Sequence, residues 1–198
     1  MRWQRGGQVG HAGSVRHLTT DELDAGLDHI RASPTDVGRL ELIVSRPGPA
    51  AREVHAGAKL DLELGLVGDT WSVRRSRRTP DGSPHPEMQL NLMNARAAAL
   101  VADEPDRRPL TGDQLYVDLD VGLRNLPVGC RLAIGETLIE ITAPPHRGCA
   151  KFADRFGTDA LRWVNSPVGR ALRLRGVNAK VVTPGTIQTG DAVRKLPT

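Results

Sequence analysis

Cys149 lies in the segment of the sequence that holds the most reactive side chains. This segment runs from Pro144 to Phe152, between a stretch rich in β-branched residues and an expected helix. Gly148 permits an unusual backbone angle, so we expect the thiol at or near the helix N-terminus. The polar residues around it are His146, Arg147 and Lys151. Helix N-termini and cations favour a thiolate, which can ligate a soft metal, carry a persulfide or attack an electrophile.

The same residues leave a plainer interpretation open. A cysteine in a globular protein is often a small buried side chain with no chemistry, and Cys149 fits that description too. Cys130 follows Gly129 at the expected start of a strand, and for this cysteine we expect burial alone. Two cysteines are too few for the disulfide framework of a secreted scaffold.

Arginine is the second chemical feature, because 23 of the 27 basic residues are Arg and only 4 are Lys. Arg binds phosphate and carboxylate groups in a bidentate manner, although a GC-rich genome gives the same bias without any function. One cluster comprises Arg74, Arg75, Arg77 and Arg78. It follows Gly65 to Trp71, whose glycines could bring backbone N–H groups close to an anion. A solvated loop is the alternative. A second cluster comprises Arg170, Arg173 and Arg175.

The composition excludes several classes of protein. With 198 residues, 39% hydrophobic and 25% charged, the chain is long enough for one globular domain or two small ones. Six aromatic residues and a net charge of +4 give little support to nucleic-acid binding. The sequence has no apolar run near 18 residues and no signal-peptide pattern, so we expect a cytoplasmic protein with no membrane partner. It also lacks P-loop, GxGxxG, HExxH, CxxC and GxSxG motifs.

The pattern of apolar residues predicts a mainly β fold. Glycine-rich residues 1–17 are expected to form a flexible arm, followed by a short helix that Thr19 and Glu22 cap and Ser33-Pro34 ends. Strands are expected near residues 38–45, 52–55, 88–92, 115–119, 131–134, 137–142, 178–183 and 191–196, and helices near 94–102, 149–156 and 159–165. Because strands and helices do not alternate, a small barrel with peripheral helices is favoured over a doubly wound sheet.

Five blocks of residues, in order, resemble the MOSC domain, the C-terminal domain of molybdenum cofactor sulfurases. The likeness covers roughly residues 38–196, so we divide the chain into an arm with a short helix at 1–37 and a MOSC β-barrel domain at 38–198. The blocks are Gly65-Leu66-Val67-Gly68-Asp69, Gly112-Asp113-Gln114-Leu115, Leu126-Pro127-Val128-Gly129 with Leu132-Ala133-Ile134-Gly135, Cys149-Ala150-Lys151, and Arg175-Gly176-Val177-Asn178-Ala179 through Gly185 to Gly190-Asp191.

The resemblance implies a closed β-barrel with a few peripheral short helices and a role around the molybdenum cofactor (molybdopterin). Family members bind this pterin through its phosphate and dithiolene, and the characterised enzymes reduce N-hydroxylated bases and related compounds. The family cysteine corresponds to Cys149, as molybdenum ligand or sulfur carrier. The Gly-Asp block corresponds to Gly68 and Asp69, near the cofactor. His146 could protonate a departing oxygen, because histidine titrates near neutral pH, or it is a turn histidine bonded to the backbone.

We therefore expect a molybdenum-dependent oxidoreductase that reduces an N–O bond in a small-molecule substrate. Cys149 and His146 are the expected catalytic residues, with Cys149 as the metal ligand. The expected cofactor-binding residues are Gly68, Asp69, Arg74, Arg75, Arg77, Arg78, Arg147 and Lys151. The sequence has no flavin or iron–sulfur motif, so another protein must donate the electrons. The alternatives are a sulfur carrier with a persulfide on Cys149, served by a sulfur-donor protein, and a barrel that binds an anion without chemistry.

Overall fold

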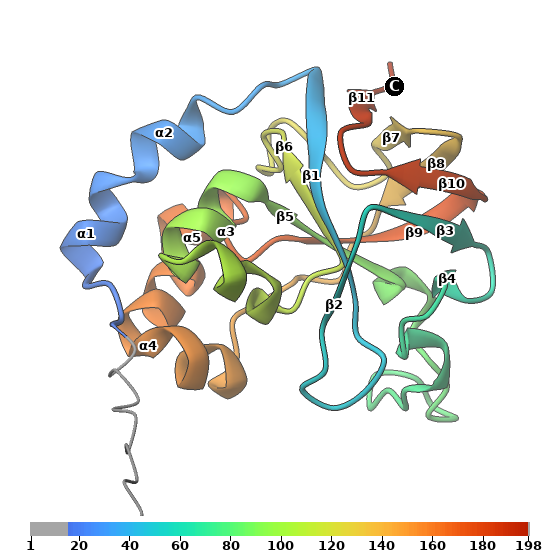
Figure 1. The fold of residues 1–198 in the computed structure, drawn as a ribbon, viewed down its shortest axis with the longest axis horizontal. Helices are drawn as coiled ribbons and strands as arrows, with labels where there is room; N and C mark the ends of the chain where they lie inside the picture. The colour runs from blue at the N-terminus through green and yellow to red at the C-terminus, as the bar shows by residue number, and fades with distance from the viewer. Residues whose placement is uncertain (1–15, 198) are drawn as a thin grey trace, which may run out of the picture.

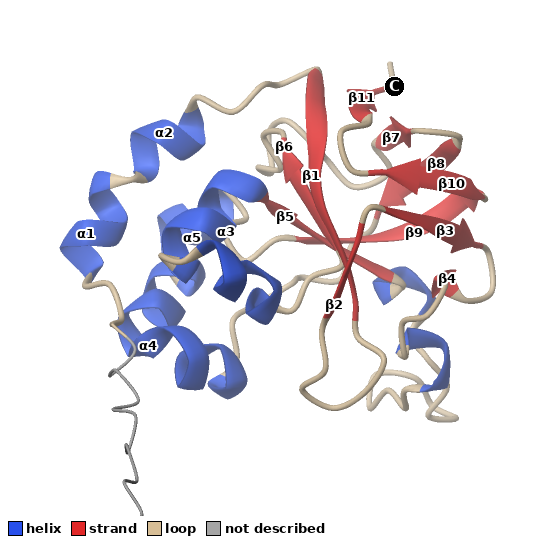
Figure 2. Ribbon diagram, viewed as in Figure 1, coloured by secondary structure: helices blue, strands red, loops and turns tan. Residues whose placement is uncertain are grey.

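Seven strands form a closed barrel in this protein. The structure is a computed structural model, and it describes residues 16–197. Around the ring the order is β1, β6, β5, β9, β8, β7 and β11, and β11 pairs with β1 to close it (Figures 1 and 2). The strands are β1 (Val37–Ser45), β5 (Leu90–Asn94), β6 (Leu115–Asp118), β7 (Arg131–Ile134), β8 (Thr137–Ile141), β9 (Val177–Thr183) and β11 (Ala192–Lys195). The closed barrel predicted from the sequence is confirmed.

Alternation of apolar and polar residues explains why these segments form barrel strands. In the β7–β8 hairpin, Leu132 and Ile134 pair with Ile139 and Thr137, and the apolar members are fully buried inside the ring. The predicted strand that included Met88 starts later than expected. Met88 ends a short 3₁₀ helix, η2 (Pro86–Met88), and β5 begins at Leu90.

Four short strands lie outside the ring. Strand β2 (Glu53–His55) pairs with β1 as the expected hairpin partner. Strands β3 (Gly57–Asp61), β4 (Gly65–Leu66) and β10 (Gly185–Gln188) form a separate sheet in the order β10-β3-β4. The sequence did not predict this second sheet, which holds the loop before Asp69 against the barrel.

The helices gather on one side of the barrel (Figure 1). They are α1 (Thr20–Ala25), α2 (Leu27–Arg31), α3 (Ala95–Ala102), α4 (Ala150–Asn165) and α5 (Pro167–Ala171), with the 3₁₀ helix η3 (Pro105–Thr111). The 3₁₀ helix η1 (Trp71–Val73) lies apart from them, beside β4 (Figure 2). The Thr19–Glu22 capping box is present, but the single helix expected there is interrupted at Gly26. The residues expected as a flexible arm fall almost wholly outside the described range.

A glycine divides α4 into the two helices that the sequence predicted. Gly157 has a φ of +89°, which a residue with a side chain rarely adopts, and a Cβ there would lie 3.0 Å from His17 Cβ. The half before Gly157 faces the site described below. The half after it packs under α1, where the Trp163 indole donates to Asp24 at 2.9 Å.

Two apolar clusters result from this arrangement. One fills the barrel, and the other lies between the helices and the outer face of the strands, with Phe152, Phe156 and Trp163 at its centre. Cys130 is buried in the first cluster, as expected. Among residues 16–197, no helix combines the length and the apolar character needed to cross a membrane.

Candidate functional site

A cationic cavity of about 570 Å³ opens where several strand ends and loops meet, and we call it the main cavity. Arg46 follows β1, Gly112 precedes β6, His146 follows β8 and Arg175 precedes β9, so loops at strand ends build most of its wall. Its six cationic residues are Arg46, Arg52, Arg74, Lys151, Arg155 and Arg175. No acidic residue of the described chain lines it. Such a cavity favours an anionic ligand.

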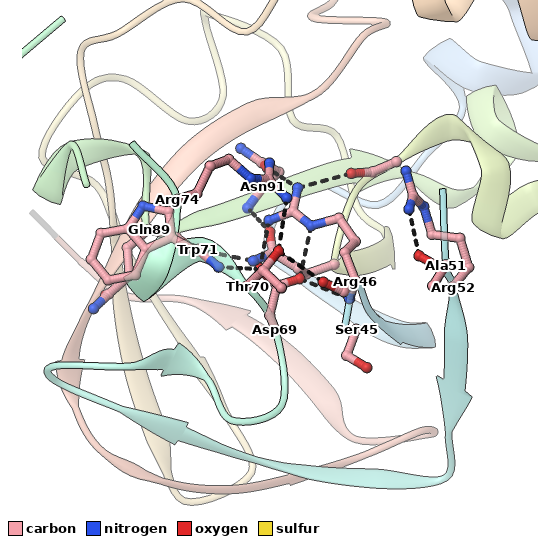
Figure 3. A network of polar contacts seen from close by, with 12 residues as sticks. Ser45, Arg46, Ala51, Arg52, Asp69, Thr70, Trp71, Arg74, Gln89 and Asn91 are labelled. Atoms are coloured by element: carbon pink, nitrogen blue, oxygen red, sulfur yellow. Dashed lines mark hydrogen bonds and ion pairs between the residues drawn. The ribbon is translucent and has the colours of Figure 1, made fainter. Parts of the chain in front are cut away.

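The floor of the main cavity is a buried ion pair between Arg46 and Asp69 (Figure 3). Arg46 Nε donates to Asp69 Oδ2 at 2.7 Å and Nη2 donates to Oδ1 at 3.0 Å, which is the bidentate geometry of a strong pair. The third nitrogen, Nη1, donates to Asn91 Oδ1 at 2.8 Å and to the Gly112 carbonyl at 3.0 Å. Asp69 also accepts the backbone N–H groups of Arg46 and Trp71.

Two asparagines extend this floor to the segment that carries Cys149. Asn91 Nδ2 donates to Asn178 Oδ1 at 2.6 Å, and Asn178 Nδ2 donates to the Pro144 carbonyl at 2.8 Å. Both asparagines are buried. Because every step is a short hydrogen bond, the loop that follows β8 is held at a fixed position beside Arg46.

Three guanidinium groups converge over Gly112. A Cβ on this glycine would lie 3.6 Å from Arg52 Nη2, 3.8 Å from Arg175 Nη2 and 3.9 Å from Arg155 Nη1. Gly112 has a φ of +97°, which glycine adopts readily. Because glycine has no side chain, the space between the three cations stays open. Burial, and then repulsion from Arg155 and Arg46, lowers the pKa of Arg52. An anion bound over Gly112 would relieve that repulsion.

A second buried pair, Arg175 with Asp113, is less completely bonded. Arg175 Nη1 donates to Asp113 Oδ2 at 2.5 Å and Nη2 donates to the Thr111 carbonyl at 2.9 Å. Three buried atoms around this pair lack any hydrogen bond: Asp113 Oδ1, His146 Nδ1 and Arg175 Nε. His146 Nδ1 lies 3.5 Å from Asp113 Oδ1.

Burial shifts the pKa of both titratable groups beside Arg175, which are His146 and Asp113. Burial, with repulsion from Arg175 and Arg46, holds the pKa of His146 well below 6.5, so the ring is neutral at neutral pH. Burial also raises the pKa of Asp113, although the Arg175 cation opposes the change. Because the imidazole is neutral, it neither attracts nor repels an anion bound among the arginines.

The residues predicted from the sequence separate into four groups. His146, Arg74 and Lys151 line the main cavity. Arg75, Arg77 and Arg78, with Arg74 and Trp71, line an adjoining cavity of about 290 Å³. Arg147 lines a third cavity, of about 220 Å³, on the other side of His146. Asp69 lies beneath Arg46, and Gly68 is in the exposed turn before it with a φ of +90°.

Cys149 is exposed and is the residue directly before α4. Its side chain is not part of the wall of the main cavity, whereas that of Lys151, two residues later, is. Within residues 16–197, no group of three or more His, Cys, Asp or Glu side chains is arranged to hold a metal ion. A metal bound among the described residues would therefore have at most two such side chains as ligands and would need others that these residues do not supply.

Sequence reasoning missed several residues of the main cavity. They are Arg46, Arg52, Asn91 and Arg155, whereas Gly112 and Arg175 were part of the MOSC-like blocks but were not predicted as site residues. Of the four that were missed, only Arg46 has a local signal, since it stands between a strand and Pro47-Gly48.

Residues 83–194 match the family model of the MOSC domain. The solved structures that resemble this chain include a hypothetical protein, with 19% identity and a TM-score of 0.58 over 86% of this chain and 72% of that chain. YuaD from Bacillus subtilis has 16% identity and a TM-score of 0.53, over 79% of this chain and 94% of its own. YiiM from Escherichia coli has 20% identity and a TM-score of 0.51, over 81% and 70%. At these identities the likeness concerns the fold. Comparison with curated proteins yields no match.

Proposed function

Because the chain belongs to the MOSC domain family, we propose that it binds the molybdenum cofactor in the main cavity and reduces small N-hydroxylated or related N–O substrates. The observation that carries this proposal is the convergence of Arg52, Arg155 and Arg175 over Gly112. The cofactor is a pterin with a phosphate, and a phosphate is the group that such a cradle of guanidinium groups binds best.

The residues of the main cavity fit the phosphate in charge as well as in shape. The three cations over Gly112 have no acidic neighbour in the cavity wall of the described chain. Arg175 Nε is a buried donor without a partner, so a bound anion could supply its missing acceptor. Arg74 and Lys151 add positive charge at the rim. In this proposal Arg46 and Asp69 do not bind the ligand directly but keep the floor rigid.

Cys149 is the proposed thiolate ligand of the metal. Cys130 is buried inside the barrel, whereas Cys149 is exposed and lies two residues before Lys151 in the main cavity. When bound, the cofactor would supply the two-electron chemistry that removes oxygen from nitrogen. The electrons would come from a separate donor protein, because the sequence has no flavin or iron–sulfur motif of its own.

His146 is proposed to hold one proton near the reacting oxygen. The neutral ring carries a single N–H, and the partner within reach of Nδ1 is Asp113 Oδ1 at 3.5 Å. With the proton on Nδ1, the other nitrogen is free to accept a hydrogen bond. Because its pKa lies well below 6.5, His146 is neutral, and it would orient a substrate hydroxyl by accepting a hydrogen bond from it at the other ring nitrogen.

The test is the cofactor content of protein purified from a host that makes the molybdenum cofactor. We expect molybdenum and pterin close to one per chain, by elemental analysis and by fluorescence of the oxidised pterin. Arg155→Ala removes one charge-assisted contact and should weaken pterin retention by roughly ten- to a hundredfold. Arg162→Ala is the matched control, because Arg162 lies on the same helix but is exposed and paired with Asp159.

Cys149→Ala separates metal ligation from phosphate binding. We expect this variant to lose molybdenum while it still binds pterin, because the cradle over Gly112 does not involve the thiol. Unmodified protein that contains neither molybdenum nor pterin would contradict the proposed function.

A sulfur carrier is the second candidate, favoured by the exposure of Cys149 outside the wall of the main cavity. In that case the thiol carries a persulfide between a donor and an acceptor protein. Mass spectrometry distinguishes the two functions, because a persulfide adds about 32 Da to the peptide that contains Cys149. This adduct in metal-free protein would favour the carrier.

A further inference from the structure

The third cavity, of about 220 Å³, lies behind His146, and we call it the side cavity. Its wall is formed by Leu123 in the loop after β6, by the loop after β8, and by the chain from the end of α4 through α5 to the start of β9. The lining residues are Leu123, Thr142, Ala143, Pro144, Pro145, His146, Arg147, Val164, Gly169, Arg170, Arg173, Arg175, Gly176 and Val177. The cavity is thus built from three separate parts of the chain.

Two arginines of the side cavity have no counter-charge. Neither Arg147 nor Arg170 forms an ion pair with any described residue, and no acidic side chain of residues 16–197 lines the cavity, although Arg175 is paired with the buried Asp113 behind the wall. Arg173 is held in place, because its Nη1 donates to the Leu126 carbonyl at 2.5 Å. Arg175 is nine-tenths buried and its Nε has no partner. These cations are suited to one anionic group.

The rest of the wall is apolar. Leu123, Val164 and Val177 contribute aliphatic surface, and Pro144 and Pro145 contribute rigid rings. An inorganic anion would leave this surface exposed to water. A ligand with a compact apolar body covers it and gains the free energy of that burial.

The side cavity and the main cavity share two wall residues, His146 and Arg175. A ligand in the side cavity therefore touches the same imidazole that faces the main cavity. His146 Nδ1 and Arg175 Nε are both buried without partners, so the shared wall offers unused polar atoms to a ligand.

We propose that the side cavity binds a small organic anion, with a compact apolar body and one carboxylate or phosphate group held by Arg147 and Arg170. The end away from the anion lies against His146. The identification of this anion as the substrate rests on the proposed function, whereas its binding does not. The substrate class is then an N–O compound that carries an acidic group, held beside the cofactor but outside the main cavity.

Benzoate, phenyl phosphate and benzamide test the binding directly. Benzoate and phenyl phosphate present the same ring with a carboxylate or a phosphate, and benzamide is the neutral analogue. In isothermal titration calorimetry of cofactor-free protein kept in excess inorganic phosphate, which occupies the cradle over Gly112, we expect at least one of the two anions to bind with one site per chain. Benzamide should bind at least about tenfold more weakly, because it lacks the charge. Comparing the two anions shows which acidic group the cavity prefers.

Variants assign the site. Arg147→Ala with Arg170→Ala should weaken binding of the preferred anion at least tenfold, because both cations of the rim are removed. Arg155→Ala, which changes the main cavity alone, and Arg162→Ala, on the exposed face of α4, should leave the affinity within about twofold. Thermal unfolding of each variant checks that it is folded.

Three outcomes would overturn the inference: neither anion binds, benzamide binds as tightly as the anions, or Arg155→Ala weakens binding more than the double variant does. Each outcome is distinct from failure of the proposed function, which is judged by the molybdenum and pterin content. Protein that contains the cofactor but binds none of the probes refutes the side cavity alone. Protein that binds benzoate but never acquires the cofactor refutes the proposed function alone.

Discussion

The two buried arginine–aspartate pairs of the main cavity are alike in chemistry and differ in how completely they are bonded. In both pairs, Arg46 with Asp69 and Arg175 with Asp113, the arginine side chain is less than 10% exposed and the aspartate side chain has no exposed surface. In the first pair, all three guanidinium nitrogens donate and both carboxylate oxygens accept two hydrogen bonds each. In the second pair, one oxygen and one nitrogen have no partner.

This difference assigns a structural role to the first pair and a ligand-binding role to the second. A fully bonded buried pair has nothing left to offer a ligand, so Arg46 and Asp69 fix the shape of the floor. An incompletely bonded pair costs stability, because each unsatisfied buried polar group carries a desolvation penalty of about 1–3 kcal/mol. Arg175 and Asp113 bear this cost beside His146, where the two cavities meet. The pair that is less stable in the empty protein is thus the one suited to bind a ligand.

The largest expected effect comes from Asp69→Asn. An amide has one accepting oxygen and one donating nitrogen. In one orientation the nitrogen faces the backbone N–H and Nε of Arg46, and in the other it faces Arg46 Nη2 and the Trp71 N–H, so two donors lose their acceptor either way. The Arg46 charge is also left without a partner. We expect a loss of about 3–5 kcal/mol in the free energy of unfolding, measured by urea denaturation. A loss below about 1 kcal/mol would show that the floor is not held by this pair.

The second effect concerns the pH dependence of stability. The pKa of His146 is lowered in the folded state, so the unfolded chain binds a proton below pH 6.5 that the folded chain does not. The contribution of the neutral His146 to the free energy of unfolding is therefore fully present above pH 6.5. It is lost as the pH falls below that value, by up to about 1.4 kcal/mol per pH unit. When the pH is lowered from 7.5 to 5.5, the free energy of unfolding should fall less in His146→Gln than in the unmodified protein.

His29→Gln is the matched control for this measurement, because His29 is exposed on α2 and far from both cavities in the sequence. Urea denaturation at several pH values gives the slope for each protein. If His146→Gln and the unmodified protein have the same slope, the neutral, buried state of His146 is wrong.

The smallest effect is expected for Asp113→Asn, the same substitution at the second pair. Here the amide oxygen can accept from Arg175 Nη1, and the amide nitrogen can donate to His146 Nδ1 once the single imidazole proton moves to the other nitrogen. Burial already disfavours the charge of Asp113 by raising its pKa, so neutralising it costs less than at Asp69, and with the new bond we expect a change of no more than about 1 kcal/mol in either direction. If this variant is destabilised as strongly as Asp69→Asn, the two pairs are equivalent and the comparison fails.

The sequence predicted the barrel strands well where apolar residues alternate. Segments 131–134 and 137–141 alternate in burial as well, and both are strands. Segment 38–45 is also a strand, although burial stops alternating after Leu42, beyond a register irregularity. The separate sheet was missed because it lacks this signal. Only Leu60 is fully buried in β3, only Ile187 in β10, and β4 has two residues. These strands form because the barrel brings them together, not because of their own pattern.

The site was harder to predict than the fold, because its residues meet through long-range pairing. Strands β5 and β6 are parallel, with Leu92 opposite Leu115, and this register brings Asn91 beside Gln114, so that Arg46 can bond both Asn91 and the Gly112 carbonyl. No local pattern specifies which strands pair in parallel. The arginine cluster after Trp71 was visible in the sequence, yet of its four members only Arg74 lines the main cavity. Local clustering identified cations but not the point where they converge.

Closure of the barrel also affects how this protein meets other copies of itself. An open sheet ends in strands with unpaired N–H and C=O groups, which attract further strands and lead to aggregation. Here the pairing of β11 with β1 removes both edges of the ring. The edges that remain in the described chain belong to β2, β4 and β10, each no longer than four residues. The ring that supports the cavities therefore also protects the protein against edge-to-edge association.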